Sequence, residues 1–175
     1  LTVSEPLLQT RSRAVWGRSL QEPKSTSRVA RFPFLQLCGE PRSAADYIAL
    51  CKEFHAFFID DIPHMNLDMR DWARRFITFV DAAYESKARL FCTSEVEIMK
   101  VFSNTTTWDE MSSSQMRVLM DDLNMDMSDV GNSSIFRGQE ELFAFARLLS
   151  RLSEMQTKPY ADMAAHDRSA RARRA

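Results

Sequence analysis

The strongest pattern of apolar and polar positions lies between residues 56 and 94. From Asp68 to about Ser86, apolar side chains recur at three- and four-residue steps, which predicts an amphipathic helix. The run AFFID at 56–60 and the run RLFCTS at 89–94 each predict a short strand beside it. Strand, helix and strand joined by short connections form a crossover unit, in which the two strands are parallel. The stripe on the helix consists of Trp72, Phe76, Phe79, Val80 and Ala83.

The stretches before this unit are less regular. The run RAVWGRSL predicts a marginal strand, and VARFPFLQLC, at 29–38, predicts a second strand that pairs with it. Because proline has no backbone N–H, Pro33 either makes the second strand an edge strand or confines it to residues 34–38.

Two further helices are predicted on either side of the crossover unit. Ser43 followed by Asp46 resembles a capping box, which predicts the start of the first of these helices. The second runs from Gln139 to Met155, where apolar residues again follow helical spacing. Beyond Tyr160 the chain is rich in Ala, Asp and Arg, and we interpret it as a frayed basic tail.

The patterns describe an α/β protein in five segments. The predicted boundaries are an irregular or edge-strand segment at 1–30, an α/β region at 31–102, an acidic, partly disordered insertion at 103–136, a helix at 137–160 and a basic tail at 161–175.

The composition agrees with one globular domain plus tails and narrows the function classes only slightly. The chain has 175 residues, of which 45% are hydrophobic and 27% charged, with a net charge of −1. The sequence contains no run of about 18 apolar residues, so no membrane span is predicted. Three widely spaced cysteines favour buried thiols in a reducing compartment. The chain starts at Leu1 without a targeting segment, so we interpret it as a processed product or a fragment of something longer.

Asp60 and Asp61 end the first strand of the crossover unit and are the candidate carboxylates. Open α/β sheets bind ligands at the carboxyl ends of parallel strands, so the pair would suit a metal or a positioned water. The sequence DDIP is equally good turn chemistry, which leaves a structural interpretation open. None of the four glycines is followed by lysine, so the sequence has no phosphate-binding loop of the P-loop type.

Four arginines are candidates for contact with a phosphate group. Arg74 and Arg75 lie on the polar side of the central helix, and Arg147 and Arg151 lie four residues apart on the last one. A guanidinium is always charged and forks onto phosphate oxygens. The alternative is a solvated helix face, in which Arg75 pairs with Asp71 and Arg151 pairs with Glu154.

Other chemistry is weakly marked. No histidine has ligand spacing with a cysteine or acid, so no metal site is predicted. A nucleophilic pair of Cys51 or Cys92 with His55 or His64 is compatible with the spacing, but nothing indicates it. The arginines after residue 167 form a solvated tail or, less favourably, a nucleic-acid contact.

Four blocks in order carry a resemblance to a known family. They are VARFPFLQLCGEPRSAADYIAL, FHAFFIDDIPHM, ARRFITFVDAAYESKARLFCTSE and FRGQEELFAFARLLSRLSEMQ, the last followed by Tyr160. Together they resemble the carboxyl-terminal part of the AFG-like (ZapE-type) ATPases, which are P-loop ATPases related to the AAA+ group. The resemblance covers roughly Val15 to Tyr160 and is interrupted by the acidic insertion.

The resemblance implies a crossover unit that extends a P-loop ATPase sheet, with ATP and Mg²⁺ as the cofactors of the complete protein. The phosphate loop, the magnesium carboxylates and the first sensor would precede Leu1, so this chain alone is expected to be inactive and to bind neither cofactor tightly. Asp60 and Asp61 then become weak candidates, whereas Arg74, Arg75, Arg151 and Arg147 become candidates for nucleotide sensing or subunit contact.

The partners implied are an amino-terminal ATPase core, further copies of the protein and an unidentified protein substrate. The resemblance also implies a mitochondrial location, association with the inner membrane through partners, a role in protein quality control, and no specific nucleic acid. One alternative is a non-enzymatic interaction module that has lost the ATPase core. A weaker one is a nucleic-acid binder that uses the basic tail.

Overall fold

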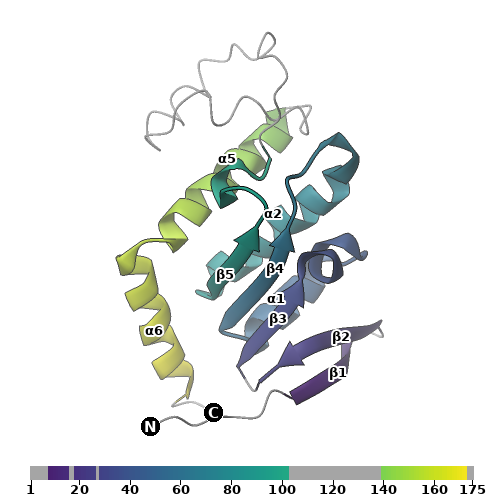
Figure 1. Ribbon diagram of the computed structural model, residues 1–175. Helices are drawn as coiled ribbons and strands as arrows, with labels where there is room; N and C mark the ends of the chain where they lie inside the picture. The colour runs from purple at the N-terminus through teal and green to yellow at the C-terminus, as the bar shows by residue number, and fades with distance from the viewer. Residues whose placement is uncertain (1–7, 16–17, 27, 103–138, 173–175) are drawn as a thin grey trace.

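The computed structural model describes residues 8–15, 18–26, 28–102 and 139–172, which form a mixed α/β fold (Figure 1). Its centre is a five-stranded sheet in which the spatial order of the strands equals their order in sequence. The first three strands pair antiparallel and the last three pair parallel. They are β1 (Leu8–Val15), β2 (Arg18–Ser25), β3 (Val29–Pro33), β4 (Ala56–Ile62) and β5 (Arg89–Ser94).

The amino-terminal segment differs from the prediction. The expected single strand through RAVWGRSL is instead the middle of a hairpin, in which Val15 pairs with Arg18 and Leu8 pairs with Ser25. Residues 16–17 between the two strands lie outside the described residues. Apolar periodicity along a single run of residues does not record where the chain turns back, so two paired strands can be taken for one.

Both predictions made from Pro33 are wrong. The strand β3 ends at Pro33 and lies between β2 and β4, so it is a central strand. Residues 35–39 form one turn of π-helix, Leu35–Gly39, rather than a strand. Proline lacks a backbone N–H, and at the last position of a strand this removes only one hydrogen bond from the sheet. The next residue, Phe34, has helical dihedral angles, so the strand does not continue beyond Pro33.

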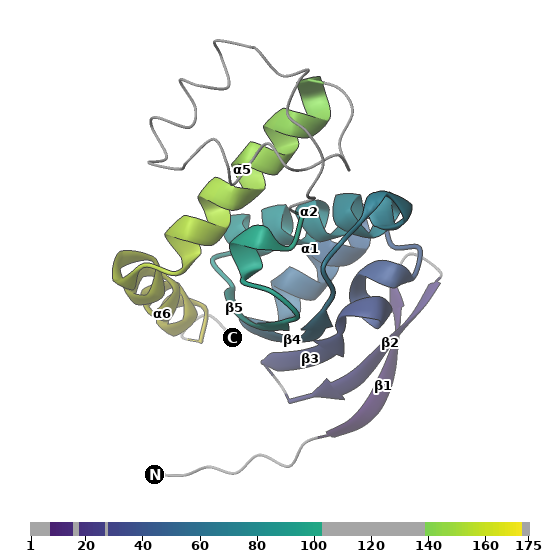
Figure 2. The same ribbon diagram turned by 45° about the horizontal axis from the view of Figure 1, so that its top comes forward.

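Two crossover helices cover one face of the parallel strands. They are α1 (Ala44–Glu53) and α2 (Arg70–Glu85), and Figures 1 and 2 show both on the same side of the sheet. The predicted capping box is confirmed, because the Asp46 carboxylate accepts hydrogen bonds from the Ser43 backbone N–H at 2.7 Å and from its hydroxyl at 2.9 Å. The predicted central helix and both flanking strands are confirmed to within two residues.

The core lies between the sheet and these helices and is rich in aromatic rings. Phe57 of β4 contacts Phe79 of α2 edge to face with 5.3 Å between ring centroids, and Tyr47 of α1 contacts the same ring at 5.6 Å. All three side chains are fully buried. Such pairs add to the apolar burial that holds helices on a sheet, so the positions of α1 and α2 are well determined.

The carboxyl-terminal region contains two helices, α5 (Gln139–Met155) and α6 (Lys158–Ala172). The first agrees with the predicted amphipathic helix, and its Phe145, Leu148 and Leu149 are buried against the core. The second replaces the tail expected after Tyr160. Tyr160 is buried and its hydroxyl donates a hydrogen bond to the Ala88 carbonyl at 3.0 Å, which fixes the start of α6 beside β5 (Figure 1).

The predicted acidic insertion at 103–136 lies outside the described residues, and the five segment boundaries stay a prediction. Continuity of this sheet with a P-loop ATPase sheet also stays a prediction. No helix within the described residues is long and apolar enough to cross a membrane.

Candidate functional site

The carboxyl end of β4 carries Asp60 and Asp61 at an irregularity of the strand. The pairing of β4 with β5 shifts register between Ile59 and Ile62, and Asp61 has a φ of 60°, in the left-handed region. The backbone N–H of Asp61 donates to the Thr93 hydroxyl at 3.0 Å. Asparagine and aspartate tolerate this conformation better than most residues. The left-handed backbone conformation therefore explains an aspartate at position 61 in structural terms.

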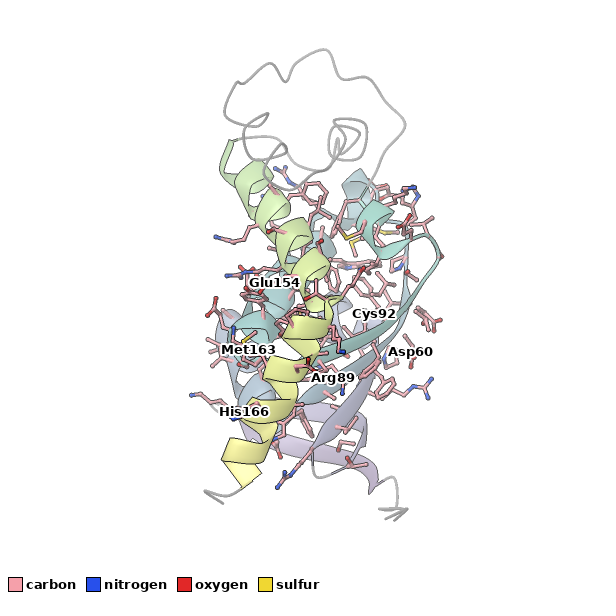
Figure 3. The ribbon with its side chains drawn as sticks, turned by 90° about the vertical axis from the view of Figure 1, so that its left-hand side faces the viewer. Asp60, Arg89, Cys92, Glu154, Met163 and His166 are labelled. Carbon is pink, nitrogen blue, oxygen red and sulfur yellow. The ribbon has the colours of Figure 1, made fainter. Side chains whose placement is uncertain are left out.

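Asp60 is engaged with a cation of the neighbouring strand. Arg31 of β3 donates two hydrogen bonds to its carboxylate, from Nε at 2.6 Å and from Nη2 at 3.1 Å. Each carboxylate oxygen accepts one of these two bonds, and the pairing raises the pKa of Arg31. A fork-to-fork pair of this type satisfies a carboxylate without a metal ion. Figure 3 shows Asp60 on the side of the sheet that α1 and α2 leave uncovered.

Arg75 is held by the backbone of the preceding π-helical turn. Its Nη1 donates to the carbonyl oxygens of Cys38 at 3.0 Å and Gly39 at 3.2 Å. Carbonyls at the end of a helical turn lack internal partners, so a guanidinium stabilises them. The expected pair with Asp71 is instead made by Arg74, at 3.7 Å. Arg74 exposes 51% of its side chain, whereas Arg75 is half-buried.

Arg147 and Arg151 meet two acids of α2. Arg151 donates to Asp81 Oδ1 and, at 2.9 Å, to Glu85 Oε1, while Arg147 Nη2 lies 3.3 Å from Asp81 Oδ2. We call these four residues the α2–α5 ion cluster. Two cations face two anions in it, so the cluster has no surplus positive charge for a phosphate group.

Tyrosines continue this contact toward α6. The Tyr84 ring lies under the Arg151 guanidinium at 4.9 Å, and its hydroxyl donates to Glu154 Oε2 at 2.6 Å, which raises the pKa of Tyr84. Tyr84 also stacks on Tyr160, with ring centroids 5.8 Å apart. Glu154 therefore binds Tyr84, and the expected pair of Arg151 with Glu154 is replaced by contacts to α2.

The structure thus brings Arg147 and Arg151 together and ties Asp60 to Arg31, while Arg74 and Arg75 have other partners. Sequence reasoning missed Asp81 and Glu85 as partners. One signal for them existed, because Asp81 and Glu85 have the same four-residue spacing as Arg147 and Arg151.

The cysteines follow the prediction in part. Cys38 and Cys51 are buried, and burial raises the pKa of the Cys38 thiol, so that thiol stays protonated at neutral pH. Cys92 is exposed, and the prediction of a buried thiol is wrong there because β5 lies at the edge of the sheet. No group of three or more His, Cys, Asp or Glu side chains in the described ranges is arranged for a metal ion.

Sequence comparison assigns the chain to one family of proteins. The chain belongs to the AFG1-like ATPase family, whose pattern it matches over residues 3–129. It is 40% identical over 146 residues to an uncharacterized protein of Schizosaccharomyces pombe, an alignment that covers 83% of this chain and 31% of that protein.

Two other relatives extend the comparison to animals and bacteria. The chain is 31% identical to lactation elevated protein 1 homolog B of Danio rerio, over 83% of this chain and 29% of that protein. It is 32% identical to the cell division protein ZapE of Escherichia coli K12, over 73% of this chain and 25% of that protein. The chain therefore spans less than a third of the length of these relatives. No solved structure matches it.

ATP and Mg²⁺, the cofactors that the family name implies, do not fit the candidate residues in the part of the chain that the structure describes. The sequence lacks a phosphate loop, Asp60 is bound to Arg31, and three of the four candidate arginines bind carbonyl or carboxylate oxygens within 3.3 Å. In these contacts Asp60, Arg75, Arg147 and Arg151 support the sheet and join helices.

Proposed function

We propose that these 175 residues are the carboxyl-terminal region of an ATP-hydrolysing AFG1-like ATPase. The observation that carries the proposal is the family match over residues 3–129 in a sequence without a phosphate loop. In this proposal the residues that bind ATP and Mg²⁺ belong to sequence outside the 175 residues. The relatives support it, because each has more than two thirds of its length beyond the aligned part.

In the complete protein, this region extends the sheet of the ATPase core and transmits the nucleotide state to a partner or substrate protein. The parallel strands β3 to β5 with two crossover helices support this role, because P-loop sheets are built from the same unit. Arg74 is the candidate that we retain for contact with nucleotide or a neighbouring subunit, since more than half of its side chain is exposed. We assign Arg75, Arg147 and Arg151 structural roles on the basis of their contacts.

The cellular part of the proposal rests on the family resemblance. We propose that the complete protein acts in mitochondrial protein quality control, as a homo-oligomer associated with the inner membrane through partners and without specific nucleic acid. The relatives include a bacterial cell-division protein, and fractionation of cells distinguishes a mitochondrial location from others.

A second candidate is a non-enzymatic interaction module that retains the scaffold of the family. The missing phosphate loop favours it, and the two candidates are separated by the coding sequence upstream of Leu1. An in-frame phosphate loop followed by a Walker B strand supports the ATPase. An authentic start codon close to Leu1 without such a block refutes it.

The biochemical test compares the 175-residue chain with the complete protein in an assay of Mg²⁺-dependent ATP hydrolysis. We expect turnover only in the complete protein, and Arg74→Ala there to reduce it at least tenfold, while Arg147→Ala leaves it within twofold. Hydrolysis by the 175-residue chain that survives Arg74→Ala would place the active site elsewhere. Labelling of the complete protein in cells, followed by fractionation, tests the mitochondrial location.

A further inference from the structure

One face of the parallel sheet has no cover among the described residues. Helices α1 and α2 both lie on the opposite face (Figures 1 and 2). On the open face, Phe58 of β4 and Phe91 of β5 are paired in register and stack with 4.7 Å between ring centroids. Their exposed fractions are 40% and 41%. These two rings form what we call the aromatic patch.

The sequence of the strands indicates that the patch is covered in the functional protein. A strand with one wet face alternates apolar and polar residues, whereas a strand buried on both faces is apolar throughout. The strand β3 alternates, with exposed Arg31 and Pro33, but β4 begins with the unbroken run AFFI and β5 contains Leu90, Phe91 and Cys92 in succession. Cover is therefore expected over β4 and β5 and not over β3.

Charges at the two borders of the patch differ. On the β3 side, Arg31 and Asp60 neutralise each other. On the other side, the Arg89 guanidinium lies 5.4 Å from the Phe91 ring centroid and makes no ion pair with any described residue. A partner that covers the patch would gain by placing a carboxylate near Arg89, at the amino-terminal end of β5.

The size of the patch argues for a partner in the same polypeptide. A buried aromatic side chain contributes about 150–250 Å², so the exposed parts of the two rings amount to roughly 160 Å². A stable interface between separate molecules buries about 800 Å² on each partner. A tethered segment needs far less area, because its effective concentration is high.

Building on the proposed function, we propose that the aromatic patch is the docking site of an amphipathic helix from the nucleotide-binding half of the complete ATPase. The helix lays an apolar stripe across Phe58 and Phe91 and directs an aspartate or glutamate toward Arg89. A helix is the expected partner because parallel sheets are covered by helices on their faces.

Photo-crosslinking in the complete protein tests the proposal. A photoreactive benzoyl-phenylalanine replaces Phe91, and the same group replaces Ile48 as the matched control, since Ile48 is exposed to 47% on α1 at the other face. We expect the probe at 91 to crosslink within the polypeptide, to a helical segment of the nucleotide-binding half, at least tenfold more than the probe at 48. Crosslinks to a second copy or to another protein, or none above the control, overturn the proposal.

A second measurement uses the difference between the two proteins. Phe91→Asp should lower the melting temperature of the complete protein by about 5 °C or more, but that of the 175-residue chain by less than half as much. Ile48→Asp should shift both proteins equally, and equal shifts for Phe91→Asp would contradict the proposal.

ATP hydrolysis by the unmodified complete protein separates this inference from the proposed function. Turnover without the crosslink refutes only the docking site. The crosslink without turnover refutes only the ATPase activity.

Discussion

Replacing Arg151 by alanine removes the main ionic contact between α2 and α5. Arg151 exposes only 18% of its side chain and reaches both Asp81 and Glu85 of α2, which lie 70 and 66 residues earlier in the sequence. Its guanidinium also lies over the Tyr84 ring. We predict that the substitution loosens α5 and lowers the free energy of unfolding.

The magnitude follows from the exposure of each partner. The hydrogen bond to Asp81, whose side chain is 27% exposed, contributes about 1.5–3 kcal/mol as a bond between charged groups. The cation–π contact adds about 0.5–1 kcal/mol, and Glu85, 69% exposed, adds less than about 0.5 kcal/mol. Arg147 remains near Asp81 after the substitution and limits the loss, so we expect about 2 kcal/mol. This corresponds to ~4–8 °C in melting temperature for a chain of this size.

The assay is urea and thermal unfolding of the 175-residue chain, followed by circular dichroism. Arg147→Ala is the matched control, because the Arg147 side chain is 54% exposed and its loss should cost at most about 0.5 kcal/mol. Double-mutant cycles with Asp81→Ala should give a coupling of about 1–2 kcal/mol for Arg151 and less than about 0.5 kcal/mol for Arg147. Equal costs for the two arginines, or a cost for Arg151→Ala below about 0.5 kcal/mol, refute the ion cluster as the link between the helices.

Three further predictions use the same unfolding measurements. Arg75→Ala should lower the free energy of unfolding by about 1.5–3 kcal/mol, because two carbonyl oxygens lose a charged donor. Arg75→Lys should restore part of this stability. Full stability in Arg75→Ala would contradict the capping role. Burial raises the pKa of Cys38 above the unfolded value of about 8.5, so stability should fall as pH rises beyond 8.5, by up to about 1.4 kcal/mol per pH unit for this group. The fall should be shallower in Cys38→Ala, and an unchanged slope would exclude this thiol as its source. Because the φ of Asp61 is 60°, Asp61→Gly should leave the free energy of unfolding within ~1 kcal/mol of the parent, whereas Asp61→Val should lower it by about 1–2 kcal/mol. Equal effects of the two substitutions would show that the backbone conformation does not restrict the residue type at position 61.

The elements set by local periodicity could be predicted from the sequence. The helix expected between Asp68 and about Ser86 is observed as α2, Arg70–Glu85, and RLFCTS forms β5 with the predicted bounds. The hairpin of β1 and β2 was not predicted, because the apolar positions of RAVWGRSL do not record that the two strands pair with each other. The helix α6 was missed because Ala, Asp and Arg resemble a tail until Tyr160 is seen to be buried.

The candidate residues could be chosen by type, but their partners could not be predicted. The i, i+4 rule assigned Asp71 to Arg75, yet the guanidinium reaches Cys38 and Gly39, 37 and 36 residues away in sequence. A contact of that length depends on how α2 lies on the sheet, and no short-range rule contains this information. The family resemblance and the α/β class needed no such contacts, which is why both could be predicted.

The order of strands in the sheet has a consequence for synthesis. Each strand lies beside its predecessor in the chain, so the sheet can assemble progressively as a ribosome delivers it from the amino end. The helix α5 must instead return across about 70 residues to reach α2, and closing so long a loop costs entropy before any contact forms. The nascent chain therefore leaves only the side of α2 that α5 contacts in water until α5 has emerged. This interval is when a chaperone would protect it most.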